Sequence, residues 1–175
     1  MKLIWLVLAA VILAGCGAGG GGAAGNAGEP GQASADPGTQ AGAASTAIVE
    51  LGTQADSAAT VIYGVELTLR LPAGVTLPAD PASGEVSDGV LRPVDARAFA
   101  GARYLPAKDG VQASVKVIIT DSGGYAIGDL ATLNCAVAPG VTVSGSGFSL
   151  EGFSARDAGG VEIRGITPRF TVRTQ

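Results

Sequence analysis

The sequence predicts an all-β fold, an antiparallel sandwich of about eight to ten strands. Apolar residues alternate with polar ones at a period of two over long runs. Turns rich in Asp, Pro and Gly separate these runs at short intervals. No stretch carries the periodicity of an amphipathic helix three turns long. Two sheets packed face to face are therefore the expected architecture.

The two longest strands are expected over 61–71 and 111–120. On each, every second residue is apolar, which indicates one buried face. Ile62 and Ile118 fall on the opposite, polar faces, where an apolar patch would meet a protein partner. The alternative is that an edge strand or a loop covers each of them. The residues expected to point inward are Val61, Tyr63, Val65, Leu67, Leu69, Leu71, Val111, Ala113, Val115, Val117 and Ile119.

Shorter strands are expected between the turns. They cover 46–51, 84–86, 90–92, 103–105, 130–138, 148–153, 161–164 and 169–173.

Composition argues against several classes of function. The 175 residues include 11 Lys and Arg, 15 Asp and Glu, and no His. An acidic chain lacks the basic stripe of a nucleic-acid-binding protein, and the usual general base is absent. The carboxylates are scattered singly, so we expect no catalytic residues and no enzyme. A glycan hydrolase stays open as the alternative, because two carboxylates about 5 Å apart in space suffice for a retaining glycosidase.

Cys135 alternates with leucine and valine, which indicates a buried thiol and not a nucleophile. No cofactor is expected apart from calcium, for which Asp121, Asp129 and Asp157 in Gly-rich turns are the candidate ligands. The alternative is that each Asp caps the backbone of its own turn.

The aromatic residues offer few platforms for a sugar. The phenylalanines are expected to fill the core, which leaves Tyr104 and Tyr125 as candidate binding residues. This scarcity favours contact with a protein over contact with a polysaccharide.

The N-terminus has the layout of a secretory signal peptide: Lys2, an apolar run over 3–13, and small residues before Cys16. The run is too short to span a bilayer, which needs about 20 residues. Leu13-Ala14-Gly15-Cys16 resembles the lipobox of bacterial lipoproteins. That resemblance implies cleavage before Cys16, diacylglycerol on its thiol and a further acyl group on the new amino terminus. Together these chains anchor a protein stably to a membrane.

The expected organisation is a signal peptide over 1–15, a lipidated cysteine with a Gly- and Ala-rich flexible tether over 16–46, and one folded domain over 47–175. The domain is expected outside the cytoplasm, in the cell envelope. Gly17 follows the cysteine where inner-membrane lipoproteins often carry aspartate, so by analogy the outer membrane is favoured over the inner one.

The second half of the domain resembles the cohesin domains and related carbohydrate-binding sandwiches. The resemblance is carried by 128–137, 147–150, 155–163 and 169–173. It implies a nine-stranded sandwich of the jelly-roll or immunoglobulin-like kind, without catalytic residues, that holds a dockerin-like protein or a polysaccharide. The leading hypothesis is a membrane-anchored, non-catalytic binding or assembly module. The alternatives are a hydrolase acting on envelope glycan and a purely structural accessory lipoprotein.

Overall fold

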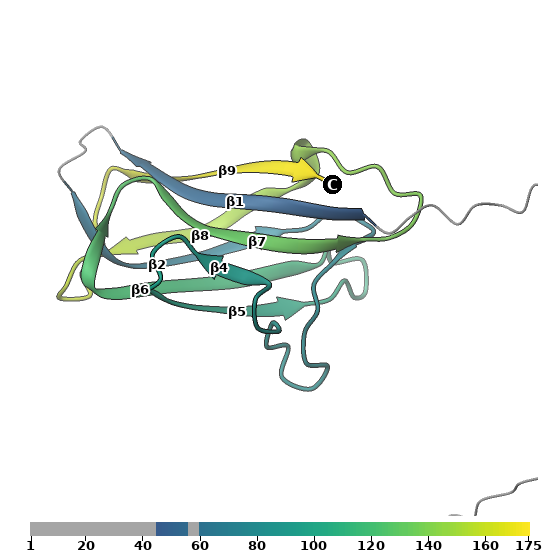
Figure 1. Ribbon diagram of the computed structural model, residues 1–175, viewed down its shortest axis with the longest axis horizontal. Helices are drawn as coiled ribbons and strands as arrows, with labels where there is room; N and C mark the ends of the chain where they lie inside the picture. The colour runs from purple at the N-terminus through teal and green to yellow at the C-terminus, as the bar shows by residue number, and fades with distance from the viewer. Residues whose placement is uncertain (1–44, 56–59) are drawn as a thin grey trace, which may run out of the picture. The chain divides into compact units, whose positions relative to one another are not determined.

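A computed structural model describes residues 45–55 and 60–175, and this part of the chain has the expected all-β fold. Two antiparallel sheets lie face to face (Figure 1). The expected signal peptide, Cys16 and most of the tether lie outside the described residues. No helix among the described residues is long and apolar enough to cross a membrane. The strands are β1 Ser45–Ala55, β2 Val61–Arg70, β3 Val75–Thr76, β4 Leu91–Pro93, β5 Phe99–Leu105, β6 Ser114–Ala126, β7 Asp129–Val137, β8 Ser149–Arg156 and β9 Ile166–Thr174, with one 3-10 turn, η1, at Gly145–Gly147.

One sheet is built around β1, which pairs with β9 on one side and β7 on the other. The far edge of β7 is shared by two short strands. β3 pairs at Val137 and Ala136, and β4 pairs further along, at Leu133 to Ala131. The second sheet has the order β5-β6-β2-β8, with every pair antiparallel.

The strand register defines two ends of the sandwich. At the first, which we call the entry end, β1 begins at Ser45 opposite Val137, and Thr46 and Gln175 exchange backbone hydrogen bonds of 3.0 and 2.9 Å. Figure 1 shows the C-terminus at this same end. The entry end carries the segments 71–75, 105–113 and 138–148, and the opposite, far end carries 93–98, 121–128 and 157–165.

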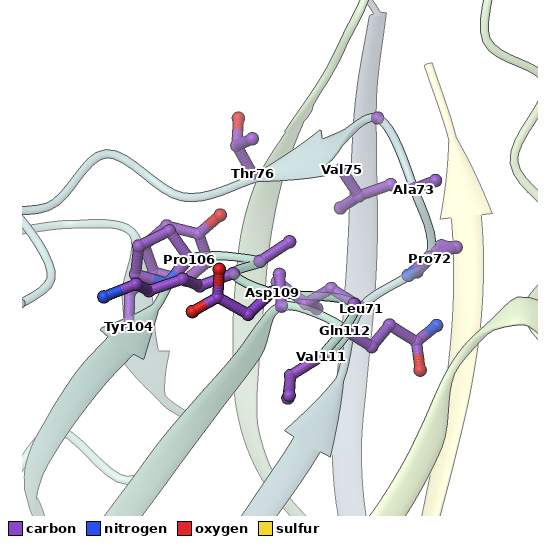
Figure 2. Close-up of a pocket in the computed structure, with 15 residues that line it drawn as sticks. Leu71, Pro72, Ala73, Val75, Thr76, Tyr104, Pro106, Asp109, Val111 and Gln112 are labelled. Atoms are coloured by element: carbon purple, nitrogen blue, oxygen red, sulfur yellow. The ribbon is translucent and has the colours of Figure 1, made fainter.

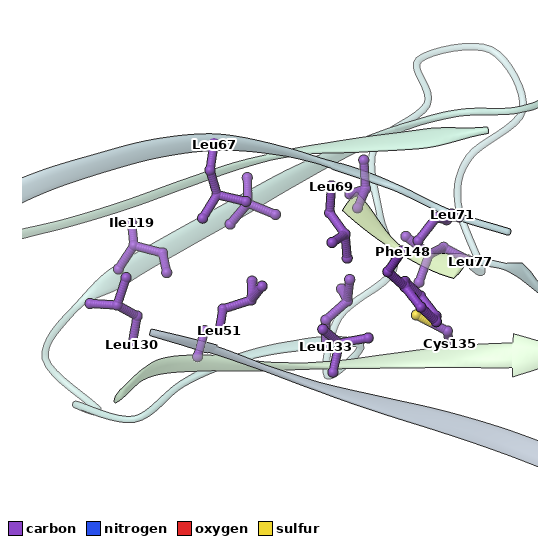
Figure 3. Packing of buried hydrophobic residues seen from close by; sticks show 14 of the residues in the cluster. Leu51, Leu67, Leu69, Leu71, Leu77, Ile119, Leu130, Leu133, Cys135 and Phe148 are labelled. Atoms are coloured by element: carbon purple, nitrogen blue, oxygen red, sulfur yellow. The ribbon is translucent and has the colours of Figure 1, made fainter. Parts of the chain in front are cut away.

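The core is a layer of aliphatic side chains between the sheets. Leu67 and Leu69 of the four-stranded sheet face Leu51 and Leu133 of the other sheet (Figure 3), and all four are no more than 1% exposed. Burying such a side chain stabilises the fold by about 1.5–3 kcal/mol. Cys135 and Phe148 extend the layer towards Leu71.

A bulge interrupts the alternation of β2. Gly64 pairs with Thr120, but Ile62 pairs with Tyr125, so residues 121–124 of β6 stand opposite Tyr63 alone. This register shift reverses the side of the sheet to which Val61 and Ile62 point. Ile62 is fully buried in the core and Val61 is 48% exposed. The prediction that Ile62 lies on a binding surface is therefore wrong, as is the predicted inward direction of Val61.

Other differences lie at strand ends. β6 begins at Ser114, because Lys108 and Val111 form a hairpin of their own, which leaves Val111 58% exposed instead of buried. The segments 84–86 and 161–164 make isolated bridges, Glu85 with Arg103 and Glu162 with Arg156, where strands were expected. β3 was not expected. It is too short for any alternation to show in the sequence.

The bulge makes a prediction about stability. Ile62→Ala should lower the free energy of unfolding by about 2–5 kcal/mol, because it leaves a cavity in the core. Val61→Ala, one residue earlier on the exposed side, should cost about 0.5 kcal/mol or less. Urea unfolding of the two variants measures both effects, and a larger loss for Val61→Ala would mean that β2 alternates without a bulge.

Candidate functional site

The outward face of the four-stranded sheet holds the candidate site. Residues paired across antiparallel strands point to the same side of a sheet. One outward row is Phe99, Thr120, Gly64 and Arg156, taken across β5, β6, β2 and β8. The next row includes Gly101 and Ile118, and a third places Lys116 beside Thr68. We call this outward surface the sheet face.

Two exposed apolar side chains mark the sheet face. Phe99 is 68% exposed and Ile118 is 41% exposed. A Cβ added to Gly101 would lie 3.4 Å from Cε1 of Phe99, so the missing side chain leaves room for the ring to lie along the sheet. Phe99 was expected in the core, and that prediction is wrong. The expectation that Ile118 lies on an outward surface is confirmed.

Tyr63 joins this surface because of the bulge. Tyr63, Gly64, Thr120 and Arg156 line a shallow groove of about 530 Å³, with Asp121, Ser122, Asp157, Ala158 and Gly160 along its sides. Gly64 has no side chain and forms part of the floor. Tyr63 was expected to point inward with Val65, and its position in the outward groove corrects that prediction.

Charged side chains lie beside the apolar residues of the sheet face. Nζ of Lys116 lies 2.6 Å from Oε1 of Glu66, and Nε of Arg70 lies 3.0 Å from Oε2 of Glu151. Exposed ion pairs of this kind contribute at most about 1 kcal/mol to stability. Exposed apolar side chains next to charged groups of both signs offer a protein partner both apolar contact and complementary charges.

A second hollow lies at the entry end, between 71–76 and 104–113, with a volume of about 780 Å³ (Figure 2). Tyr104, Pro72 and Pro106 give it apolar walls. Asp109 and Gly110 form the two-residue turn of the hairpin beside it, both with positive φ, as such turns require. Tyr104, a predicted binding residue, is half-buried here, and burial raises the pKa of its hydroxyl.

Tyr125, the other predicted platform, is turned into the protein. Its hydroxyl donates a hydrogen bond of 3.3 Å to the carbonyl oxygen of Ile119. Burial, followed by the nearby Asp121 carboxylate, raises the pKa of Tyr125. The ring helps to line a small apolar pocket of about 230 Å³ with Ile119 and Leu130, and it offers no flat exposed platform.

The three candidate calcium ligands stabilise separate parts of the chain. Oδ1 of Asp121 accepts a hydrogen bond of 2.7 Å from the amide of Gly123. Oδ1 of Asp157 accepts 2.9 and 2.8 Å bonds from the amides of Gly159 and Val161, and Asp129 pairs with Arg169. Within 45–55 and 60–175, no three acidic or thiol side chains come together as a metal site. The capping alternative accounts for the contacts of Asp121 and Asp157.

One charged cluster at the far end was not found from the sequence. Nη2 of Arg97 lies 2.7 Å from Oδ2 of Asp95 and 3.9 Å from Oδ2 of Asp121. The side chain of Asp121 is 5% exposed, and its Oδ2 accepts no hydrogen bond in the described structure. Hydrogen bonds from Arg97 lower the pKa of Asp95 to about 2. Asp95 is therefore ionised near neutral pH and unsuited to act as a general acid.

Cys135 is a core residue, as predicted. It is 1% exposed, and burial raises its pKa from 9.0 to about 12. Since the thiolate is the nucleophile, this thiol is unreactive near neutral pH.

Thiol labelling tests this environment. In a Cys16→Ser background, Cys135 should react with a thiol reagent at pH 8 only after urea unfolds the chain, because the native thiol is both buried and protonated. The native state disfavours the thiolate, so its stability should fall as pH rises from about 9 towards 12. Rapid labelling of the folded protein at pH 8 would show that the thiol is accessible.

Comparison with known proteins finds no family model, no curated protein and no solved structure that matches this chain.

Proposed function

We propose that this chain is a lipid-anchored, non-catalytic binding or assembly module of the bacterial envelope, with a cohesin-like sandwich that holds a protein partner. The single observation that carries the proposal is the sheet face, where Phe99, Ile118 and Tyr63 lie on the outside of a rigid sheet. Large apolar side chains gathered on a surface mark a binding site more often than a structural need.

The architecture supports tight binding by such a face. β2 and β6 lie in the middle of their sheet, and their inward residues Leu67, Leu69 and Val117 are completely buried. The outward residues are therefore held in place before a partner arrives, which reduces the entropy lost on binding. Tyr63 and Arg156 in the groove belong to residue types that carry much of the energy of protein interfaces.

A protein is a better partner than a polysaccharide for this surface. Sugar binding on a flat sheet relies on several exposed rings, but Ile118 and the ion pairs occupy most of the middle of the sheet face. Side chains of both charges give a protein partner complementary groups, which set its orientation.

Anchoring to the membrane is supported by the sequence Leu13-Ala14-Gly15-Cys16. In this proposal the lipid on Cys16 holds the protein in the envelope. The outer membrane is favoured over the inner one, because Gly17 stands where inner-membrane lipoproteins often carry aspartate. Two or more acyl chains give stable attachment, whereas one gives only reversible binding.

The anchor can be tested by Cys16→Ala. In cells grown with radiolabelled palmitate, the wild-type chain should take up label and sediment with membranes, and the variant should do neither. Cys135→Ala serves as the matched control and should behave as wild type, because Cys135 lies in the core. Label retained by Cys16→Ala would contradict lipidation at this residue.

The sheet face can be tested by Phe99→Ala and Ile118→Asp in a pull-down from envelope extract, beside a panel of polysaccharides. Loss of a central interface residue costs about 2 kcal/mol, or about 30-fold in Kd. Both variants should therefore lose the captured protein.

Val111→Asp is the control, since it changes an exposed valine at the entry end, away from the sheet face. Retention on a polysaccharide alone, or equal capture by all variants, would overturn the proposed function. Release of soluble fragments from envelope glycan would favour the hydrolase alternative.

A further inference from the structure

The small apolar pocket beside Tyr125 lies at the far end of the sandwich and reaches the core. Ile119 of β6 and Leu130 of β7 line it, and they are 1% and 4% exposed. Tyr125 and Ile127 line it as well, and its volume is about 230 Å³. An apolar cavity of about 150 Å³ is large enough to bind benzene. The far-end pocket therefore has room for one ring of benzene to indole size.

Hydrogen bonds hold the walls of this pocket in place. The amide of Val94 donates a 2.8 Å bond to the carbonyl oxygen of Leu130, which ties the loop before β5 to β7. The amide of Thr53 donates a 2.7 Å bond to the carbonyl oxygen of Gly128, and the amide of Gly128 donates a 3.2 Å bond to Oγ1 of Thr53. The pocket is thus formed before a ligand arrives, which reduces the entropy lost on binding.

The carboxylates around the pocket are already paired. Asp95 and Asp129 are the charged residues that line it. Asp95 pairs with Arg97 at 2.7 Å, and Asp129 pairs with Arg169. Asp121 stands outside the lining, and Nη2 of Arg97 lies 3.9 Å from its Oδ2. A charged ligand would lose its hydration without gaining a free partner of opposite charge, so the lining favours an uncharged molecule.

Small side chains keep the pocket open. Ala98 and Ala126 line it at positions where a larger apolar side chain would fill the space. Val94 also lines it and is 63% exposed, so the pocket has apolar surface where it meets solvent. The lining atoms of an unfilled apolar hollow have fewer contacts than atoms in a packed core. An apolar ligand supplies those contacts.

We propose that the far-end pocket is a binding site for a small, uncharged molecule with an apolar ring of benzene to indole size. The ring packs against Ile119, Ile127 and the aromatic side chain of Tyr125. Aromatic pairs add an attraction of their own to the burial of apolar surface. This site is separate from the sheet face, and its occupation requires neither the lipid on Cys16 nor a protein partner.

Methyl NMR with indole as the probe tests the site. The full-length chain with Cys16→Ser lacks the thiol that would carry the lipid, so no detergent is needed that would absorb indole. The isoleucine δ1 methyl groups are labelled with ¹³C and assigned by single substitutions with valine. About millimolar indole should shift the Ile119 and Ile127 signals saturably. The Ile118 signal should stay in place, because this neighbour points out of the opposite side of β6.

Variants and charged analogues sharpen the test. Ala98→Phe should abolish the shifts by filling the pocket, and Ala98→Leu is the second filling variant if the first does not fold. Ala82→Phe, on an exposed turn, is the matched control and should bind as wild type. Benzylamine and benzoate, which carry the ring with a charge, should bind about tenfold more weakly or worse.

Three results would overturn the site: no saturable shift in the wild-type chain, equal shifts at Ile118 and Ile119, or full binding by a folded Ala98 variant. Equally tight binding of the charged analogues would overturn the proposed class of ligand. None of these results bears on the anchor or on the sheet face, so failure of this inference is distinguishable from failure of the proposed function.

Discussion

The apolar layer between the two sheets is the constraint on which the other features depend. Leu51 and Leu133 from one sheet meet Leu67 and Leu69 from the other, and each is almost completely shielded from water. Cys16 and Cys135 are the only cysteines, and Cys135 is unpaired, so no disulfide holds the described domain together. Because the layer takes one side of each sheet, the outward sides are free to carry residues that stability does not require. Phe99 and Ile118 are two such outward residues.

The sequence predicts the fold class because the core demands alternation along the strands. The run from Val65 to Leu71 shows this clearly, and there the predicted inward residues are buried. The same rule fails just before, at Ile62, because four residues of β6 stand opposite Tyr63 and reverse the faces. A bulge depends on the pairing of two strands distant in sequence, which no periodicity within one strand reveals. Short strands such as β3 escape prediction for a related reason, since they exist only through pairing with β7.

The candidate site was partly predictable. Ile118 breaks a clear polar pattern and was found from the sequence. Phe99 was assigned to the core because phenylalanine is usually buried; its pairing opposite Thr120 places it outside. The sequence does show that Phe99 and Gly101 are two residues apart, a spacing that places both on one face of a strand. In the structure the ring of Phe99 lies beside this glycine. The charged cluster of Arg97, Asp95 and Asp121 forms because the loop before β5 lies against the bulged part of β6. Sequence spacing does not reveal that contact.

The core orders the sheet face, and the bulge adds Tyr63 to it. In the proposed function, a lipid on Cys16 would keep that face in the envelope. The most direct measurement is photo-crosslinking in living cells, with a benzophenone amino acid at position 118 and, separately, at position 111 of the entry end. A discrete adduct with one protein at position 118 and none at position 111 is the predicted result. No adduct at 118, or the same adducts at both positions, would contradict a partner on the sheet face.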